Sequence, residues 1–226
     1  MSETDSFIEE VTEEVRRDKL FALYRKYGWV AGLAVVLLVG GAAYNEWNKH
    51  RETVAAQEFG DKIMAALSEN DVSKRADAIA KVPVDDPAAK PFLALLQAAT
   101  MAENNDRNGA VKVLDAVAAD EGAPALYRSL AELKAVILRG KDMDKTARMA
   151  ALDKLATPGN PFRTMAMEEK ALALVEYGDT AGAIKELQAL LQEPGITQDL
   201  LDRAQRLIVA LGGTLPDANP ANVSKG

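Results

Sequence analysis

The sequence predicts an all-α protein in which one membrane-spanning helix precedes a solenoid of helical hairpins. Strong helix formers (alanine, leucine, glutamate and lysine) dominate the composition, whereas aromatic residues make up only 5% of it. An uncharged stretch of eighteen residues runs from Tyr27 to Tyr44, near the N-terminus. Beyond that stretch, related segments recur about every 36 residues.

Composition excludes several function classes. The formal net charge of −7 argues against broad nucleic-acid binding, which needs a basic face to displace phosphate counterions. The chain has no cysteine and one histidine, so thiolate metal sites, disulfides and Ser-His-Asp triads find no support. Neither a phosphate-binding loop motif nor a dinucleotide fingerprint is present. We therefore assign no catalytic, cofactor-binding or metal-ligating residue, and we expect a protein that is not an enzyme.

Residues 1–26 form an arm that precedes the apolar stretch. The pattern Ser6-Phe-Ile-Glu9 is a capping box, which predicts the start of a helix. Ile8, Val11 and Val15 then share one face of that helix. Two interpretations stay open: the helix lies along the inner membrane leaflet or docks on a partner, or it is solvated and merely carries orientation charges.

Residues 27–47 are predicted to form the transmembrane helix, because the uncharged stretch spans about 27 Å as a helix. Interfacial aromatic anchors flank it: Tyr24, Tyr27 and Trp29 at one end, Tyr44 and Trp47 at the other. A buried core helix is the first alternative, but core helices carry no such paired girdle. A cleaved signal peptide is the second, although the preceding segment is long and rich in acidic residues. An uncleaved anchor fits the sequence best.

Basic residues predict the orientation of this helix. Five lie before the stretch and two lie just after it: Arg16, Arg17, Lys19, Arg25 and Lys26, then Lys49 and Arg51. The positive-inside bias places the N-terminus in the cytoplasm and the rest of the chain across the membrane.

Within the span, Gly28, Gly32 and Gly40 are spaced by multiples of four residues. Small residues at such spacing let another membrane helix approach closely, which predicts either a partner subunit or a homodimer. The alternative is that glycine is simply frequent in membrane helices.

Residues 48–212 are predicted to form the hairpin solenoid, and residues 213–226, which contain Gly213, Pro216 and Pro220, a flexible tail. Two sets of segments align without gaps at offsets of 35 to 38 residues. One set contains Ala98, Ala135 and Ala171, where paired helices would cross closely; the other contains Leu114, Leu152 and Leu187, which would fill the layer between units.

The segment from Glu169 to Ile196, EKALALVEYGDTAGAIKELQALLQEPGI, resembles the tetratricopeptide repeat family. The shared features are a small residue in the first helix, a Gly-Asp turn, an early alanine in the second helix and a late proline. Alanine replaces the usual first-helix glycine and the early large aromatic residue is missing, so the family's groove contacts are not carried over.

The layout as a whole resembles the YfgM-like family of bacterial inner-membrane proteins: an arm reading DSFIEEVTEEVRRDKLFALYRKYGW, one membrane helix, and a divergent repeat domain. This resemblance implies a periplasmic repeat domain, an ancillary place at the SecYEG translocon, and work beside periplasmic chaperones. The alternative is an assembly or coordination factor for another envelope, division or respiratory membrane complex. A hydrolase is opposed by the empty catalytic inventory.

The concave face of such a solenoid is its expected binding surface. Leu95, Glu132 and Glu168 occupy equivalent first-helix positions, so they are candidate groove residues, and the groove would be acidic in its later units. The alternative is that they are ordinary exposed positions. The adjacent pair Glu168-Glu169 is expected to be solvated.

Overall fold

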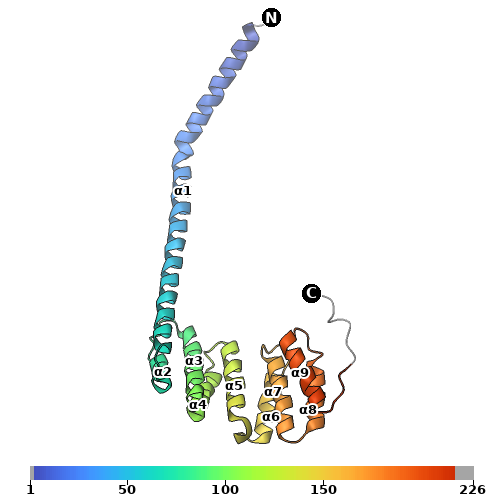
Figure 1. Ribbon diagram of the computed structural model, residues 1–226. Coiled ribbons are helices and arrows are strands. Elements are labelled where there is room, and N and C mark those ends of the chain that lie inside the picture. Colours follow the sequence, from blue (N-terminus) through green and yellow to red (C-terminus); the bar gives the residue numbers. More distant parts are fainter. Residues whose placement is uncertain (1–2, 217–226) are drawn as a thin grey trace. The chain divides into compact units, whose positions relative to one another are not determined.

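The structure is a computed structural model that describes the backbone of residues 3–216 and the side chains of residues 25–30 and 32–216. Every regular element in that part of the chain is a helix (Figure 1), so the predicted all-α fold is confirmed. The chain divides into two compact units, Met1–Asp61 and Lys62–Gly226.

Helix α1 (Glu3–Leu67) is a single element of 65 residues. It begins before the capping pattern at Ser6, so the predicted helix start is wrong. No proline occurs before Pro83, and the continuous helix marks no boundary between the arm, the apolar stretch and the segment that follows.

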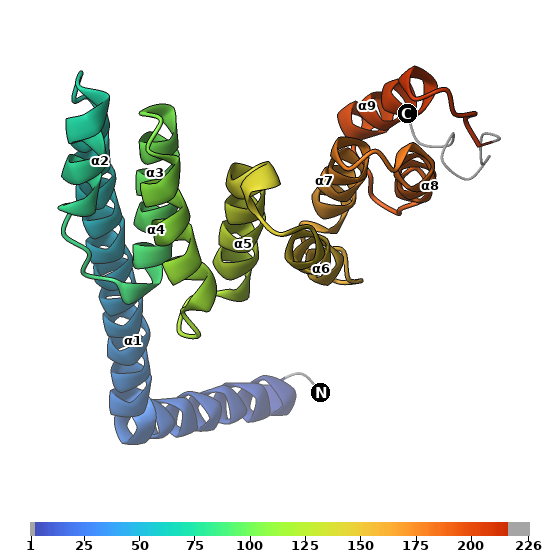
Figure 2. The same ribbon diagram turned by 90° about the horizontal axis from the view of Figure 1, so that it is seen from below.

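The second unit continues as a series of shorter helices. These are α2 (Val72–Ala80), α3 (Lys90–Glu103), α4 (Arg107–Ala119), α5 (Ala125–Arg139), α6 (Lys145–Leu155), α7 (Arg163–Glu176), α8 (Thr180–Leu190) and α9 (Gln198–Ala210), with 3-10 turns η1 (Pro87–Ala89) and η2 (Gly140–Asp142). Across Figure 2, the pair α3–α4 is followed by α5–α6 and then by α7–α8, and α9 lies next to α7. Helices α3–α4, α5–α6 and α7–α8 form three successive hairpins, and α4 also packs against α5 of the next hairpin.

The core is divided into clusters that follow the hairpins. Ala98, Leu114 and Ala135 are buried together in the cluster of α3, α4 and α5. Leu152 is buried between α5, α6 and α7, and Ala171 and Leu187 are buried with residues of α9. All six residues expected to pack the repeats are therefore inside, and each cluster spans neighbouring helices rather than the whole unit.

Aspartate begins the second helix of every hairpin. Asp106, Asp144 and Asp179 each accept a hydrogen bond from the backbone N–H three residues on, at 2.9, 3.0 and 2.8 Å. In α4 and α8 the donor is a glycine, and a Cβ built on Gly109 or Gly182 would lie 2.1 or 2.3 Å from the capping carboxylate. In α6 the donor is an alanine and the cap persists, so the carboxylate can shift to make room.

Arg148 of α6 is a charged side chain buried in the second unit, with 4% of its surface exposed. Its Nη1 donates to Oε2 of Glu176 on α7 at 2.6 Å. Burial alone would lower the pKa of Arg148, but its interactions with Glu176 and Tyr177 together outweigh burial and hold the pKa above its ordinary value. Because Arg148 is buried, removal of Glu176 would leave its charge uncompensated, and this contact therefore ties α6 to α7.

Helix α9 closes the array. Leu200, Ala204 and Ile208 form its buried face, whereas Arg203 and Arg206 are exposed. Exposed polar side chains suit a terminal helix, which no further unit covers within the residues described.

The buried alanines supply a test of the packing. Replacing Ala135 or Ala171 by leucine should overpack the helix crossing and lower the free energy of unfolding by about 1–3 kcal/mol. Urea unfolding of the detergent-solubilised protein, followed by helical circular dichroism, measures this loss. The same substitution at Ala116, which is exposed on α4, is the control and should change little. Unchanged unfolding of both core variants would show that the repeat register is wrong.

Candidate functional site

The largest of the hollows described here on the second unit is a groove of about 630 Å³ between α7 and α9. Leu172 of α7 and Leu207 of α9 give it an apolar floor. Its walls carry charge: Glu168 and Glu169 stand on α7, and Arg203 and Arg206 on α9. A groove of this kind holds a polypeptide segment by apolar contact and selects it by charge.

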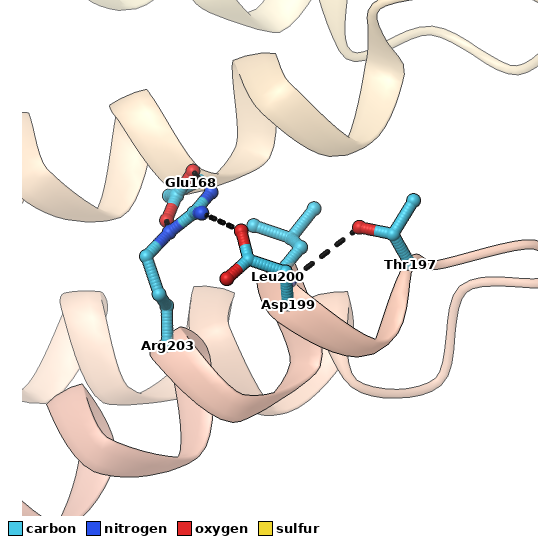
Figure 3. Close-up of polar contacts among 5 residues, drawn as sticks. All are labelled: Glu168, Thr197, Asp199, Leu200 and Arg203. Carbon is cyan, nitrogen blue, oxygen red and sulfur yellow. Dashed lines mark hydrogen bonds and ion pairs between the residues drawn. The ribbon is translucent and has the colours of Figure 1, made fainter.

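Glu168 and Arg203, which line this groove, belong to one charge cluster (Figure 3). Arg203 donates from Nε to Oε1 of Glu168 at 2.8 Å and from Nη2 to Oε2 at 2.9 Å, and it also contacts Asp199. The hydrogen bonds to Glu168, followed by the charges of both carboxylates, raise the pKa of Arg203 above its ordinary value. Thr197, whose Oγ1 accepts from the N–H of Leu200 at 3.4 Å, begins α9 and so positions this cluster.

Two groups of the groove have no such partner. Burial raises the pKa of Glu169, and the neighbouring charge of Glu168 raises it further, while Arg148 opposes the shift. Glu169 forms no side-chain hydrogen bond or ion pair within residues 25–216, and the exposed Arg206 forms none there either. The groove therefore offers one partly buried carboxylate and one open cation on opposite walls.

The three candidate groove residues do not share one groove: Glu168 lines the groove between α7 and α9, whereas Leu95 and Glu132 lie elsewhere. Leu95 is buried in the core cluster of α3, so it faces no ligand. Glu132 lines a separate hollow of about 300 Å³ between α4, α5 and α6, where Lys154 Nζ lies 2.9 Å from both of its carboxylate oxygens. Glu168 is neutralised by Arg203, and its pair with Glu169 is not simply solvated. Repeat register alone does not reveal these cations, which lie on other helices.

In the first unit, the apolar stretch is exposed on all sides. Helix α1 contains a segment long and apolar enough to cross a membrane. Leu38 and Val36, for example, expose 74% and 66% of their surfaces, as lipid-facing side chains would. The side chains of a core helix would be buried, so this exposure argues against a buried core helix.

The predicted aromatic anchors are exposed where the structure describes them, at Tyr27, Trp29, Tyr44 and Trp47; the side chain of Tyr24 lies outside the described residues. The sequence did not predict that a cation accompanies the ring at each end. Lys26 Nζ lies 5.5 Å from the centre of the Tyr27 ring, and the Arg51 guanidinium 5.3 Å from that of Trp47. Such pairs suit the membrane interface, where a ring and a charge are both stabilised.

Gly28, Gly32 and Gly40 have open space beside them. A Cβ built on any of them meets no described heavy atom within 4 Å beyond its own chain neighbours. No other described segment of this chain packs on that face.

The described residues contain no cluster of three or more histidine, cysteine, aspartate or glutamate side chains suited to a metal ion.

Glu169 gives a pH-dependent prediction. The pKa of Glu169 is higher in the folded state than in the unfolded state. The ionised carboxylate therefore lowers the free energy of unfolding at pH values above the folded-state pKa. This loss disappears as the pH falls below the pKa of the unfolded state. The variant E169Q should therefore be more stable than the parent at neutral pH, and the difference should close in mild acid. Urea unfolding at both pH values tests this, with E121Q at an exposed position as the control. A gain that persists unchanged in acid would contradict the assignment.

Comparison with known proteins gives one family. The profile described as "Tetratricopeptide repeat-like domain" matches residues 22–206. Searches of curated proteins and of solved structures found no match. The matched region includes the apolar part of α1, all three hairpins and most of α9, which is the larger part of the chain. The chain therefore belongs to the tetratricopeptide repeat-like domain family.

Proposed function

We propose that this protein is a non-enzymatic scaffold of the bacterial inner membrane, placed beside the Sec translocon, where it helps to pass secreted proteins to periplasmic chaperones. Repeat domains of this family serve protein–protein interaction, and that general role carries the proposal. The observation that supports membrane attachment is the exposed apolar stretch of α1, which lies in the same chain as the repeat array.

Three features support the translocon rather than a freely diffusing partner. The layout of arm, single span and divergent repeats resembles the YfgM-like family, whose members are ancillary to SecYEG. The open face at Gly28, Gly32 and Gly40 offers a neighbouring membrane helix a close approach. The charge bias across the span directs the repeat domain to the periplasm.

The groove between α7 and α9 supports a binding role over catalysis. Arg203 and Glu168 are held by each other, and the remaining lining combines leucine with single open charges. This arrangement suits modest, reversible binding of exposed segments rather than activation of a nucleophile.

The second candidate is an assembly or coordination factor for another envelope, division or respiratory complex. The same glycine face favours it, because close helix packing does not specify which complex supplies the neighbouring helix. A homodimer through that face is the third outcome.

Orientation is the first prediction. Protease added to spheroplasts should digest residues beyond 47 and spare the arm, because the basic residues before the span stay in the cytoplasm. Epitope tags at the two ends report which part survives, and detergent-opened cells, in which both tags are lost, are the control. A protected C-terminal domain would reverse the orientation and remove any periplasmic role.

Partner identity is the second prediction. A photo-crosslinking residue at Val36, within residues 28–44, should capture translocon subunits, and one at Leu172, within residues 88–177, should capture a periplasmic chaperone or nascent chains. Mass spectrometry identifies the products, and a crosslinker at the exposed Ala116 is the matched control for Leu172. Consistent capture of division or respiratory proteins would favour the second candidate. Capture of only a second copy would leave the translocon proposal without its physical support.

A further inference from the structure

One cation recurs beside a buried alanine in three helices, namely the first helices α5 and α7 of two hairpins and the terminal helix α9. The pairs are Lys134-Ala135 in α5, Lys170-Ala171 in α7 and Arg203-Ala204 in α9, and all three alanines are buried. The recurrence places each cation at a comparable point of its helix, next to the crossing with the preceding hairpin.

Two of these cations form ion pairs with carboxylates of the same chain. Lys170 Nζ lies 2.8 Å from Oδ1 of Asp153 on α6 and 3.0 Å from Oε2 of Glu186 on α8. Burial alone would lower the pKa of Lys170, but the hydrogen bonds and the negative charges of Asp153 and Glu186 together outweigh burial and raise it. Arg203 is likewise held by Glu168 and Asp199. Each of the two cations therefore has two intramolecular carboxylates.

Lys134 has neither of the two carboxylate partners that Lys170 has in the next repeat. In the repeat alignment, Asp115 corresponds to Asp153, but Asp115 contacts Arg139 instead. Ala151 stands where Glu186 stands one repeat later, so α6 offers no carboxylate at that position. Lys134 is exposed, and it forms no ion pair within the described side chains.

An apolar hollow lies directly beside this cation. Its volume is about 170 Å³, and it lies between α3 and α5 above the buried Leu114. Ala98, Ala99 and Ala102 form one wall, and Ile137 and Leu138 the other. Ile137 leaves 40% of its surface exposed at this edge, although a bulky aliphatic side chain is normally covered.

We propose that this hollow docks a polypeptide segment in which a large apolar side chain stands next to an aspartate or glutamate side chain. The apolar side chain fills the space between α3 and α5, and the carboxylate pairs with the Lys134 ammonium, which lines the same hollow. Charge complementarity selects this occupant over a basic or a neutral one. The proposal rests on the scaffold role above and names the chemistry of one kind of segment that the scaffold would hold.

The test measures peptide binding to the full-length protein in lipid nanodiscs by fluorescence anisotropy. The probe is a short labelled peptide with a central Asp-Leu-Leu-Asp between Gly-Ser flanks, with both ends blocked so that no terminal charge contributes. Comparison peptides carry Lys-Leu-Leu-Lys or Asp-Ser-Ser-Asp at the centre. The first peptide should bind tightest, since only it satisfies both the hollow and the cation.

Four variants separate the two contributions. K134E should weaken binding of the Asp-Leu-Leu-Asp peptide about tenfold, whereas K134R should retain it. A99F should fill the hollow and weaken binding similarly. A151E restores the missing carboxylate on α6, so it should compete for Lys134 and weaken binding without altering that residue. K112E and A116F repeat the charge and size changes at exposed positions of α4 that line none of the described hollows, and they should bind as the parent does.

Equal binding of the acidic and basic peptides, or full binding by both K134E and A99F with intact helical spectra, would overturn the proposal. The scaffold role is judged separately by the crosslinking at Val36 and Leu172. If translocon subunits are captured but the peptides bind equally well, only the present inference is wrong. If the acidic peptide binds selectively but no translocon subunit is captured, only the Sec assignment is wrong.

Discussion

The repeat array depends on helices that approach one another closely at buried alanines. Ala98, Ala135 and Ala171 are nearly or completely inaccessible, and each belongs to a cluster that also holds a leucine of the second helix. A small side chain at the crossing sets the distance between helices, and the leucine fills the layer that this distance leaves. Because each cluster reaches only its neighbours, the unit is stabilised one contact layer at a time rather than by one central core.

Much of this arrangement could be predicted from the sequence, because the spacing of apolar residues along a helix and the spacing of the repeats both indicate which positions are buried. The hairpins, their small crossing residues and their layer-filling leucines follow from alignment of three segments. The capping role of Asp106, Asp144 and Asp179 was not anticipated, although each stands three residues before its hydrogen-bond donor. Helix α9 was not aligned with the repeats, so Arg203 and Arg206 were missed together with the groove that they line.

Charge was harder to predict than packing for a physical reason. Whether a carboxylate is free or forms an ion pair depends on cations of other helices, which are often more than 20 residues away in the sequence. Glu132 forms an ion pair with Lys154, and Glu168 forms one with Arg203. The two carboxylates that were expected to make the groove acidic are therefore neutralised. Surface ion pairs of this kind add little stability, but they decide which charges remain to face a partner.

Ala151 stands where Glu186 stands one repeat later, and the leucines beside them, Leu152 and Leu187, are both buried. An ion pair between neighbouring helices is therefore present in one unit and absent from another, while the same layer-filling leucine packs in both. In such an array, the charges presented to a partner can differ from unit to unit without any change in the contacts that hold the helices together.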